Sequence, residues 1–178
     1  MSDNTLMKKF EEEVWSKVPH REEKDGKVQI VNATPLIDLT NDLKECAKTV
    51  YDVDISNKDF KIYGKFDCTL LTGSIKVRPA VNIIHDAITT GKINSGTTVI
   101  EATSGNFGIA LGLLSKIGVT AIALVSRKLQ EGVFKELRNG NIRIMDLDMD
   151  ICPAPGMEDK QDALVAKATA ANIRSQMI

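Results

Sequence analysis

The sequence predicts an α/β fold in which helices flank a parallel sheet. Segments 98–100, 119–125 and 142–147 have the aliphatic and β-branched composition of buried strands. Segments 109–117 and 130–138 have the length and pattern of helices and lie between them. Strands that alternate with helices pair in parallel through right-handed crossovers, so we expect one sheet that is covered on both faces.

Length and composition narrow the class of protein. The chain has 178 residues and a formal net charge of −1, which suits a domain with a real core and gives no electrostatic sign of a nucleic-acid or membrane partner. No apolar run has the length of a membrane span or a signal-peptide core, so we expect a cytoplasmic protein. Cys46, Cys68 and Cys152 are widely spaced, so neither a zinc site nor a disulfide framework is expected.

Residues 1–27 are charged and contain apolar residues at helical spacing: Leu6, Phe10 and Val14, with Trp15 and Val18 beside them. We favour a plain surface helix. The alternative is a helix whose apolar stripe docks on the same chain or on a second subunit. Residues 19–27 are predicted to be a solvated loop.

The next segments alternate between strand and helix. We expect a short strand over 28–32, a helix over 39–51 and a strand over 61–66. Thr40 or Asn41 is the expected N-cap of that helix. The residues expected to face inward on this helix are Leu43, Ala47 and Val50, with Cys46 as a buried filler.

Two polar turns stand out in the middle of the chain. The first, Glu101 to Gly112, follows a strand and offers Thr103, Ser104 and Asn106 as N-cap residues. Gly108 and Gly112 are small enough for close packing of the following helix on a sheet. Free amides in a first helical turn favour an anion, so this turn is a candidate carboxylate or phosphate site.

The second turn, Leu71 to Arg78, places Lys76 where the chain bends into a helix over 79–89, which Gly91 is expected to end. Each turn by itself is also compatible with an ordinary polar connection. In that case Lys76 is an exposed lysine at the start of a helix.

Together the two turns resemble the Gly-Ser-x-Lys-x-Arg segment and the Thr-Ser-Gly-Asn-x-Gly loop of fold type II pyridoxal-phosphate enzymes, the cysteine synthase and tryptophan synthase β family. Three further segments match that family in order: Asn32-Ala33-Thr34-Pro35-Leu36, Ile84-His85-Asp86-Ala87 and Gly91-Lys92-Ile93. The resemblance runs from about residue 28 to about residue 144. It implies the small N-terminal domain of these enzymes, with most of the large domain missing.

The resemblance also implies roles for individual residues. Lys76 would carry pyridoxal phosphate as an internal Schiff base and move the proton at the substrate Cα. Asn106 would hydrogen-bond the cofactor's ring hydroxyl. The residues that would hold the substrate carboxylate are Thr103, Ser104, Gly105, Asn106 and Phe107. The implied reaction is β-replacement or β-elimination on a small serine-derived amino acid, with sulfide or another thiol or amine as nucleophile.

Two departures leave the nucleophile open. Phe107 stands where cysteine synthases usually have threonine, and Val77 where they often have aspartate.

The family's phosphate-binding glycine loop and its pyridine-facing serine or threonine belong to a later domain, beyond these residues. The chain is therefore interpreted as an N-terminal piece, as half of a split enzyme completed by a C-terminal half, or as a silent paralogue that binds a partner or a small ligand. A homodimer is also expected. A dinucleotide-binding domain is a weaker alternative, because no Gly-x-Gly-x-x-Gly follows a predicted strand.

The C-terminal segment has fewer signals. Asp146, Asp148 and Asp150 alternate with apolar residues, but nothing completes a calcium loop, so no metal is expected. A break at 152–156 precedes a predicted helix over 158–177. We therefore divide the chain into an N-terminal helical extension (1–27), an α/β domain (28–150) and a segment (151–178) that leads toward a second domain.

Overall fold

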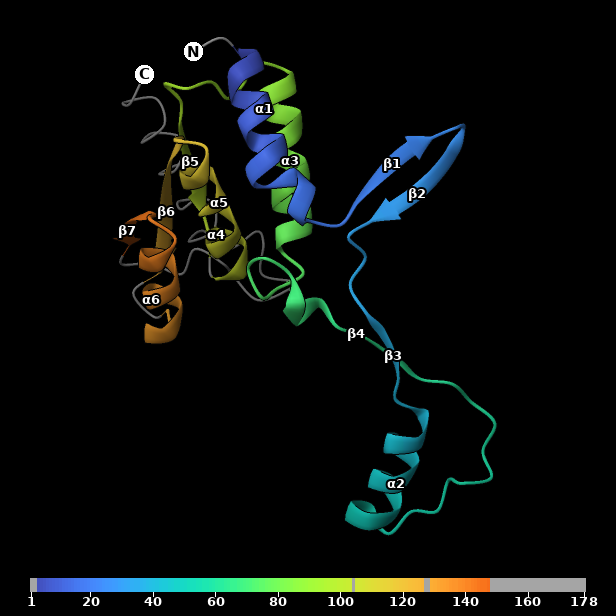
Figure 1. Ribbon diagram of the computed structural model, residues 1–178. Helices are drawn as coiled ribbons and strands as arrows, with labels where there is room; N and C mark the ends of the chain where they lie inside the picture. Colours follow the sequence, from blue (N-terminus) through green and yellow to red (C-terminus); the bar gives the residue numbers. More distant parts are fainter. Residues whose placement is uncertain (1–2, 104, 127–128, 148–178) are drawn as a thin grey trace, which may run out of the picture.

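The computed structural model describes residues 3–103, 105–126 and 129–147, which form two regions. We call residues 3–19 and 67–147 the body and residues 20–66 the arm. In Figure 1 the body gathers a sheet and most of the helices, while the arm extends away from it.

The body is built on a three-stranded parallel sheet. Its strands are β5 (Thr98–Ala102), β6 (Thr120–Ser126) and β7 (Arg143–Leu147), in the order β5-β6-β7. Central β6 is buried at six of its seven residues, as a strand between two others should be. The predicted parallel sheet is confirmed.

Four helices of the body follow these strands or precede them. They are α3 (Val77–Thr89), α4 (Asn106–Leu111), α5 (Leu113–Lys116) and α6 (Glu131–Asn139). Residues of all four share one core cluster with Val99, Ala123 and Val125 of the sheet. Ile100, Ile122 and Leu124 point to the other face and form a separate buried cluster. Within the described residues, the predicted cover by helices is therefore seen on one face.

Gly108 and Gly112 do permit close packing, although the sheet is not their neighbour. A Cβ on Gly108 would lie 2.5 Å from Cγ2 of Thr103 and 3.1 Å from Cδ2 of Leu137. A Cβ on Gly112 would lie 3.1 Å from the carbonyl oxygen of Gly140, at the end of α6. The two glycines therefore let α4 approach α6 and the loop before it.

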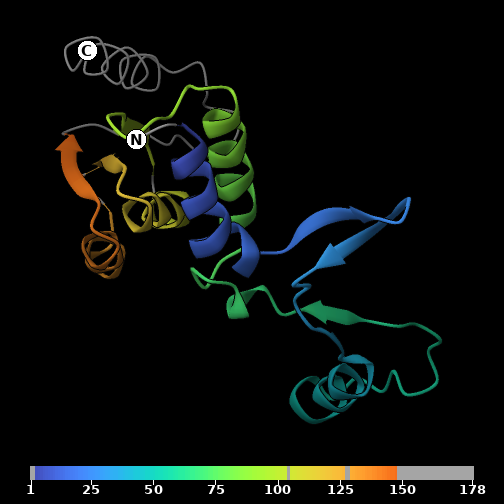
Figure 2. The ribbon, with the colours of Figure 1, turned by 45° about the horizontal axis from the view of Figure 1, so that its top comes forward.

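The N-terminal helix α1 (Asp3–Glu13) and the short 3₁₀ helix η1 (Trp15–Lys17) belong to the body core. Leu6, Phe10, Val14 and Val18 are all buried, in the same cluster as residues of α3. α1 packs against α3, as Figures 1 and 2 show. The expectation of a plain surface helix is wrong, because the apolar stripe docks on the same chain.

Residues 20–31 form a β-hairpin, so the prediction of a loop over 19–27 is wrong. Strands β1 (His20–Lys24) and β2 (Lys27–Val31) pair antiparallel. Asp25 and Gly26 join them with φ of 54° and 70°, the two positive values that a type I′ turn needs. The predicted strand at 28–32 corresponds to β2.

The outer part of the arm contains α2 (Thr40–Tyr51) between two short antiparallel strands, β3 (Leu36–Asp38) and β4 (Tyr63–Lys65). α2 confirms the predicted helix, but the expected inward face is wrong: Leu43, Cys46 and Val50 are exposed, and Ala47 is half-buried. None of the stronger contacts between elements of the described residues involves α2. The cap is also different, since the amide of Thr40 donates to Oδ1 of Asp38 at 2.9 Å.

Several sequence predictions fall on residues outside the described ranges. These are Ser104, Asp148, Asp150, Cys152, the break at 152–156 and the helix at 158–177. The division of the chain at residues 27 and 150 stays a prediction. Among the described residues, no helix has the length and apolar character that crossing a membrane requires. The same residues contain no group of three side chains suited to a metal ion.

Candidate functional site

The two polar turns that the sequence singles out meet at one cavity of about 680 Å³. The described residues that line it are Lys76, Ala102, Thr103, Gly105, Asn106, Phe107, Gln130 and Val133. α3 and α4 pack against each other, so the turns that begin these helices open on the same space. The cavity also lies beyond the carboxyl end of β5, where α/β sheets commonly bind ligands.

Lys76 reaches the cavity from a tight turn. Gly73 has φ of +67°, a conformation that favours glycine, and its amide donates to the carbonyl of Leu70 at 2.7 Å. Oγ of Ser74 accepts the amide of Lys76 at 3.1 Å, and α3 begins directly afterwards. The side chain of Lys76 is exposed and forms no ion pair with a described residue. Its amine is therefore accessible to a ligand in the cavity.

Thr103 holds the opposite loop in place. It is buried, and its Oγ1 accepts the amides of Gly108 at 3.0 Å and of Gly105 at 3.5 Å. α4 begins at Asn106 with Gly105 in the N-cap position, so none of the three predicted cap residues occupies it. The Thr103 hydroxyl is thus engaged with the backbone, and its role toward a substrate stays a prediction.

Asn106 and Phe107 present the loop to the cavity. Asn106 is exposed, and the amides of both residues donate no hydrogen bond within the described part of the chain. Phe107 is half-buried because its ring also packs against the body core. Among the described residues, the loop therefore offers two donors without a partner beside a bulky apolar group, an arrangement that can bind an anion.

Sequence reasoning missed Gln130 and Val133. Gln130 precedes the first residue of α6, and Val133 lies in its first turn. The signal lies in the sheet order: α6 follows β6, which pairs with β5 in parallel, so the ends of these strands lie at the same edge of the sheet. A polar residue at the start of the helix after β6 is therefore expected near the loop after β5.

The lining fits the reactive part of pyridoxal phosphate. A cavity of about 680 Å³ lies within the roughly 300–1,000 Å³ typical of small-ligand sites. Lys76 supplies the amine and Asn106 a side-chain amide, the two groups that the resemblance requires. Lys76 is also the one charged residue among the described lining residues, so none of the others supplies a positive charge for the phosphate.

A polar cluster fixes the base of the arm next to Lys76. We call Thr34, Asp67 and Arg78 the clasp. Oδ1 of Asp67 accepts Nη2 of Arg78 at 2.7 Å and Oγ1 of Thr34 at 2.7 Å. The hydrogen bond from Arg78, then that from Thr34, lowers the pKa of the Asp67 carboxyl below its ordinary value of 3.8. Since Arg78 lies two residues after Lys76, the clasp ties the arm to the lysine turn.

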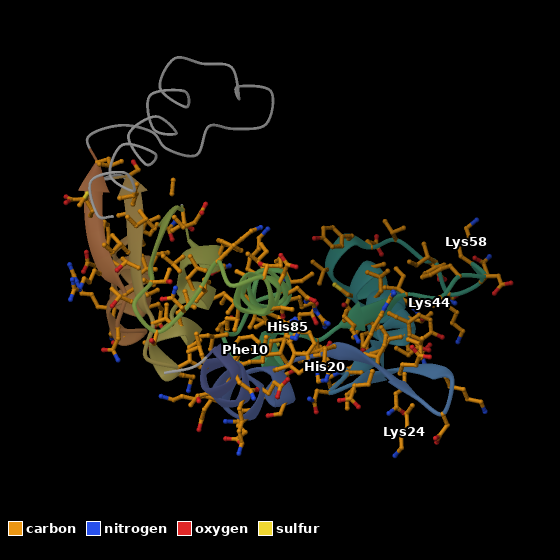
Figure 3. The ribbon with its side chains drawn as sticks, turned by 90° about the horizontal axis from the view of Figure 1, so that it is seen from above. Phe10, His20, Lys24, Lys44, Lys58 and His85 are labelled. Carbon is orange, nitrogen blue, oxygen red and sulfur yellow. The ribbon has the colours of Figure 1, made fainter. Side chains whose placement is uncertain are left out.

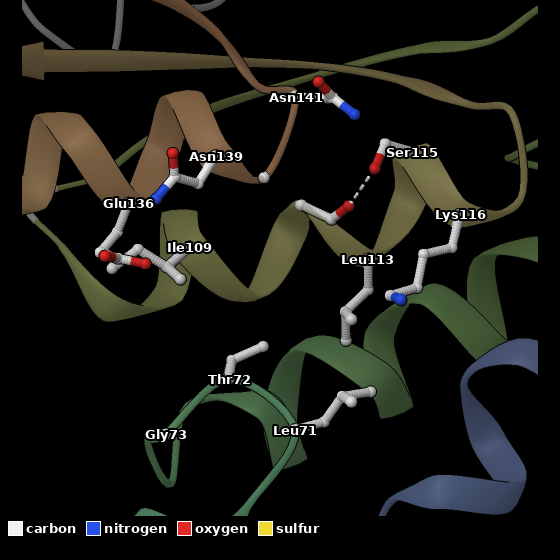
Figure 4. A pocket seen from close by; sticks show the side chains of 12 residues that line it. Leu71, Thr72, Gly73, Ile109, Leu113, Ser115, Lys116, Glu136, Asn139 and Asn141 are labelled. Carbon is white, nitrogen blue, oxygen red and sulfur yellow. Dashed lines mark hydrogen bonds between the residues drawn. The ribbon is translucent and has the colours of Figure 1, made fainter.

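A second cavity, of about 580 Å³, lies between the Leu71–Gly73 turn, α4, α5 and the end of α6 (Figure 4). It contains none of the predicted site residues. Thr72 lines it, and Oγ1 of Thr72 is buried without a hydrogen-bond partner. The hydroxyl of Ser115 is already bonded to the carbonyl of Gly112, so we assign no chemistry to this cavity.

Comparisons with known proteins find a matching family model and similar proteins. A family model described as pyridoxal-phosphate dependent enzyme matches residues 30–175. A cysteine synthase of Aquifex aeolicus is 36% identical over 96 residues, 54% of this chain and 27% of that protein. An N-(2-amino-2-carboxyethyl)-L-glutamate synthase of Ralstonia nicotianae is 33% identical over 112 residues, 62% of this chain and 30% of that protein.

Solved structures share the fold. The O-acetylserine dependent cystathionine beta-synthase from Helicobacter pylori superposes with a TM-score of 0.56 at 28% identity, over 78% of this chain and 40% of that chain. An O-ureido-L-serine synthase gives a TM-score of 0.58 at 23% identity, over 79% and 39%. The chain therefore spans less than half the length of these relatives.

Proposed function

The chain belongs to the pyridoxal-phosphate-dependent enzyme family, and we propose that it supplies the lysine-bearing part of a site for β-replacement or β-elimination on a serine-derived amino acid. The observation that carries this proposal is the shared cavity, in which Lys76 faces the loop of Asn106 and Phe107. In this arrangement, the lysine amine that would bind the cofactor lines the same cavity as the residues that would contact the cofactor ring and the substrate.

Lys76, Asn106 and Phe107 have roles that their positions in the cavity support. When bound, the cofactor supplies the electron sink for a negative charge at the substrate Cα. Nζ of Lys76 holds the cofactor and moves the proton at Cα. The side-chain amide of Asn106 binds the cofactor ring, and the backbone amides of Asn106 and Phe107, which have no partner among the described residues, bind the substrate carboxylate. Together these contacts fix which bond at Cα is broken.

Phe107 and Gln130 are the residues that we expect to select the nucleophile. Both line the cavity, and neither is explained by holding the cofactor. The names of the relatives support a choice between sulfur and nitrogen acceptors, since one makes cysteine and another an N-substituted glutamate. The location that we propose is cytoplasmic, and the assembly is a homodimer or a complex with a C-terminal half.

The test of this proposal is cofactor attachment. Pyridoxal phosphate is added to the purified chain, the visible spectrum is recorded, and borohydride reduction is followed by peptide mapping. We expect a new absorption band and a reduced label on Lys76. Lys76→Ala should lose both, whereas Lys92→Ala, which removes another exposed lysine after α3, should keep them.

No band, or a label spread over surface lysines, would contradict cofactor binding by this chain alone. A silent paralogue would give that result even when a C-terminal half is supplied. Phe107→Thr then tests the choice of nucleophile in the loaded protein: it should shift the relative rates with sulfide and with amines and leave the Lys76 label unchanged.

A further inference from the structure

Another cavity lies where the hairpin of the arm meets the body. Its volume is about 350 Å³, within the roughly 300–1,000 Å³ typical of small-ligand sites. Residues from η1, both strands of the hairpin and α3 line it, and none of these residues lines the cavity of Lys76. Trp15, His20 and Arg21 belong to this lining and precede residues 30–175, which the family model matches. The cavity is therefore built partly outside the family match.

The described lining of this cavity is cationic. Arg21 and Arg78 contribute guanidinium groups, and none of the described lining residues is acidic. Arg78 uses Nη2 for both of its bonds, to Asp67 and to Thr34, so its Nε and Nη1 donors have no partner among the described residues. Arg21 forms no ion pair within the same ranges. Guanidinium groups bind a carboxylate through two parallel hydrogen bonds, so an anion of this kind fits the cavity.

Aromatic rings make one wall of the cavity rigid. Trp15 stacks on His85, with 4.5 Å between ring centroids and 29° between ring planes, and its centroid lies 4.6 Å from that of His20. The two ring nitrogens of His20 are bonded to the carbonyl of Val18 at 2.8 Å and to the carboxylate of Glu22 at 2.9 Å. The Trp15 ring is therefore held in place as a flat surface against which a ligand can pack.

The hairpin brings a charge and an apolar side chain to the same face. Arg21 and Ile30 are opposite each other in the register of β1 and β2, so their side chains are neighbours, and both line the cavity. Ile30 is nevertheless 63% exposed. A ligand with an anionic end and an apolar end would meet both groups at once.

We propose that this cavity binds a small organic carboxylate with an apolar or aromatic tail. The carboxylate bridges Arg21 of the hairpin and Arg78 of α3, while the tail packs between Trp15 and Ile30. An inorganic anion is a poorer ligand, because it satisfies the two arginines and leaves Ile30 in water.

The proposed ligand would join the arm to the body. Arg21 belongs to the arm and Arg78 to the body, so one carboxylate bound by both closes the hairpin onto α3. Arg78 is also a member of the clasp and lies two residues after Lys76. A bound carboxylate therefore restrains the lysine turn from a site that does not overlap the cofactor cavity.

The experiment uses the fluorescence of Trp15, the only tryptophan of the sequence, which reports on this cavity directly. The intact 178-residue chain, without pyridoxal phosphate, is titrated with phenylacetate. Phenylacetamide removes the charge of this probe, acetate removes its ring, and inorganic phosphate supplies charge alone. Arg21→Gln removes one guanidinium from the cavity. Arg143→Gln is the matched control, because Arg143 is an exposed residue of β7 outside it.

We expect a saturable change in emission with phenylacetate and at least about tenfold weaker binding of the other three compounds. Arg21→Gln should weaken phenylacetate binding by about tenfold or more, whereas Arg143→Gln should bind as the parent chain does. Both residues are exposed, so the melting temperatures of the free chains should agree. In the bound chain, the amides of β1 and β2 should exchange more slowly with solvent.

Three results would overturn the proposal: no saturable change with phenylacetate, binding of acetate or phosphate as tight as that of phenylacetate, or equal weakening by the two arginine variants. None of these readouts uses pyridoxal phosphate or turnover. The proposed reaction can therefore fail without affecting them, and this site can fail without affecting the label on Lys76.

Discussion

The body and the arm each contain an amphipathic helix of similar length, and these helices end in opposite environments. α1 has 11 residues and buries Phe10 completely against the body. α2 has 12 residues and leaves Tyr51 72% exposed. The comparison teaches that an apolar stripe shows that a helix needs a partner but does not show where the partner is. Figure 3 makes the contrast visible, with Phe10 beside His85 in the body and Lys44 and Lys58 out on the arm.

The largest effect that we predict is seen when Phe10 of α1 and Tyr51 of α2 are each replaced by alanine. Phe10→Ala should lower the free energy of unfolding by about 3–5 kcal/mol, because it opens a cavity under α1. Tyr51→Ala should change it by about 0.5 kcal/mol or less, since an exposed side chain leaves no cavity. Urea unfolding followed by circular dichroism measures both values. Equal losses would mean that the arm is packed in solution.

The second prediction concerns two helical glycines of the body. Gly108→Ala should cost about 1–3 kcal/mol, since the new methyl group meets Thr103 and Leu137 at less than contact distance. Gly132→Ala in α6 has no atom within 4 Å of the new Cβ and should gain about 0.5–1 kcal/mol from helix propensity. The same unfolding experiment distinguishes them. A neutral Gly108→Ala would show that α4 lies further from α6.

The smallest effect is expected at the clasp, where body and arm meet. The folded state favours ionised Asp67, because the pKa of its carboxyl is lowered from 3.8. This stabilisation is fully present above pH about 4 and is lost as the pH falls through the lowered pKa. The difference in melting temperature between the parent chain and Asp67→Asn should therefore shrink below pH 4.

Asp42→Asn is the control for the carboxyl-to-amide change itself, because Asp42 is an exposed residue of α2 outside the clasp. A pH-independent difference for Asp67→Asn would show that the Arg78 contact does not favour the ionised carboxyl in solution.

Local signals account for the features that the sequence predicted correctly. The strands at 98–102, 120–126 and 143–147 are apolar enough to identify, and the two polar turns are marked by their glycine and small polar residues. The meeting of Lys76 with the Asn106 loop followed from the family resemblance, which placed both turns in one site. The packing of α3 against α4 supplies the physical reason.

The features that were missed depend on contacts between distant segments. The hairpin at 20–31 had a local signal, Asp25-Gly26, but its first strand, His20–Lys24, is almost entirely charged and lacks the alternation of a buried strand. The inward face expected for α2 was wrong because a local apolar pattern does not show whether another element covers it, and Leu43 and Val50 are exposed. Gln130 entered the site through the pairing of β6 with β5, which only the sheet order reveals.

Amide hydrogen exchange on the isolated chain is the most direct test of the contrast between body and arm. We predict slow exchange in α3 and β6, whose residues are buried in the body. The amides of β2, β3 and α2 should exchange orders of magnitude faster, because these elements open without disrupting any core. Equally slow exchange in the arm would contradict the account, since it would mean that the arm is stable without a partner.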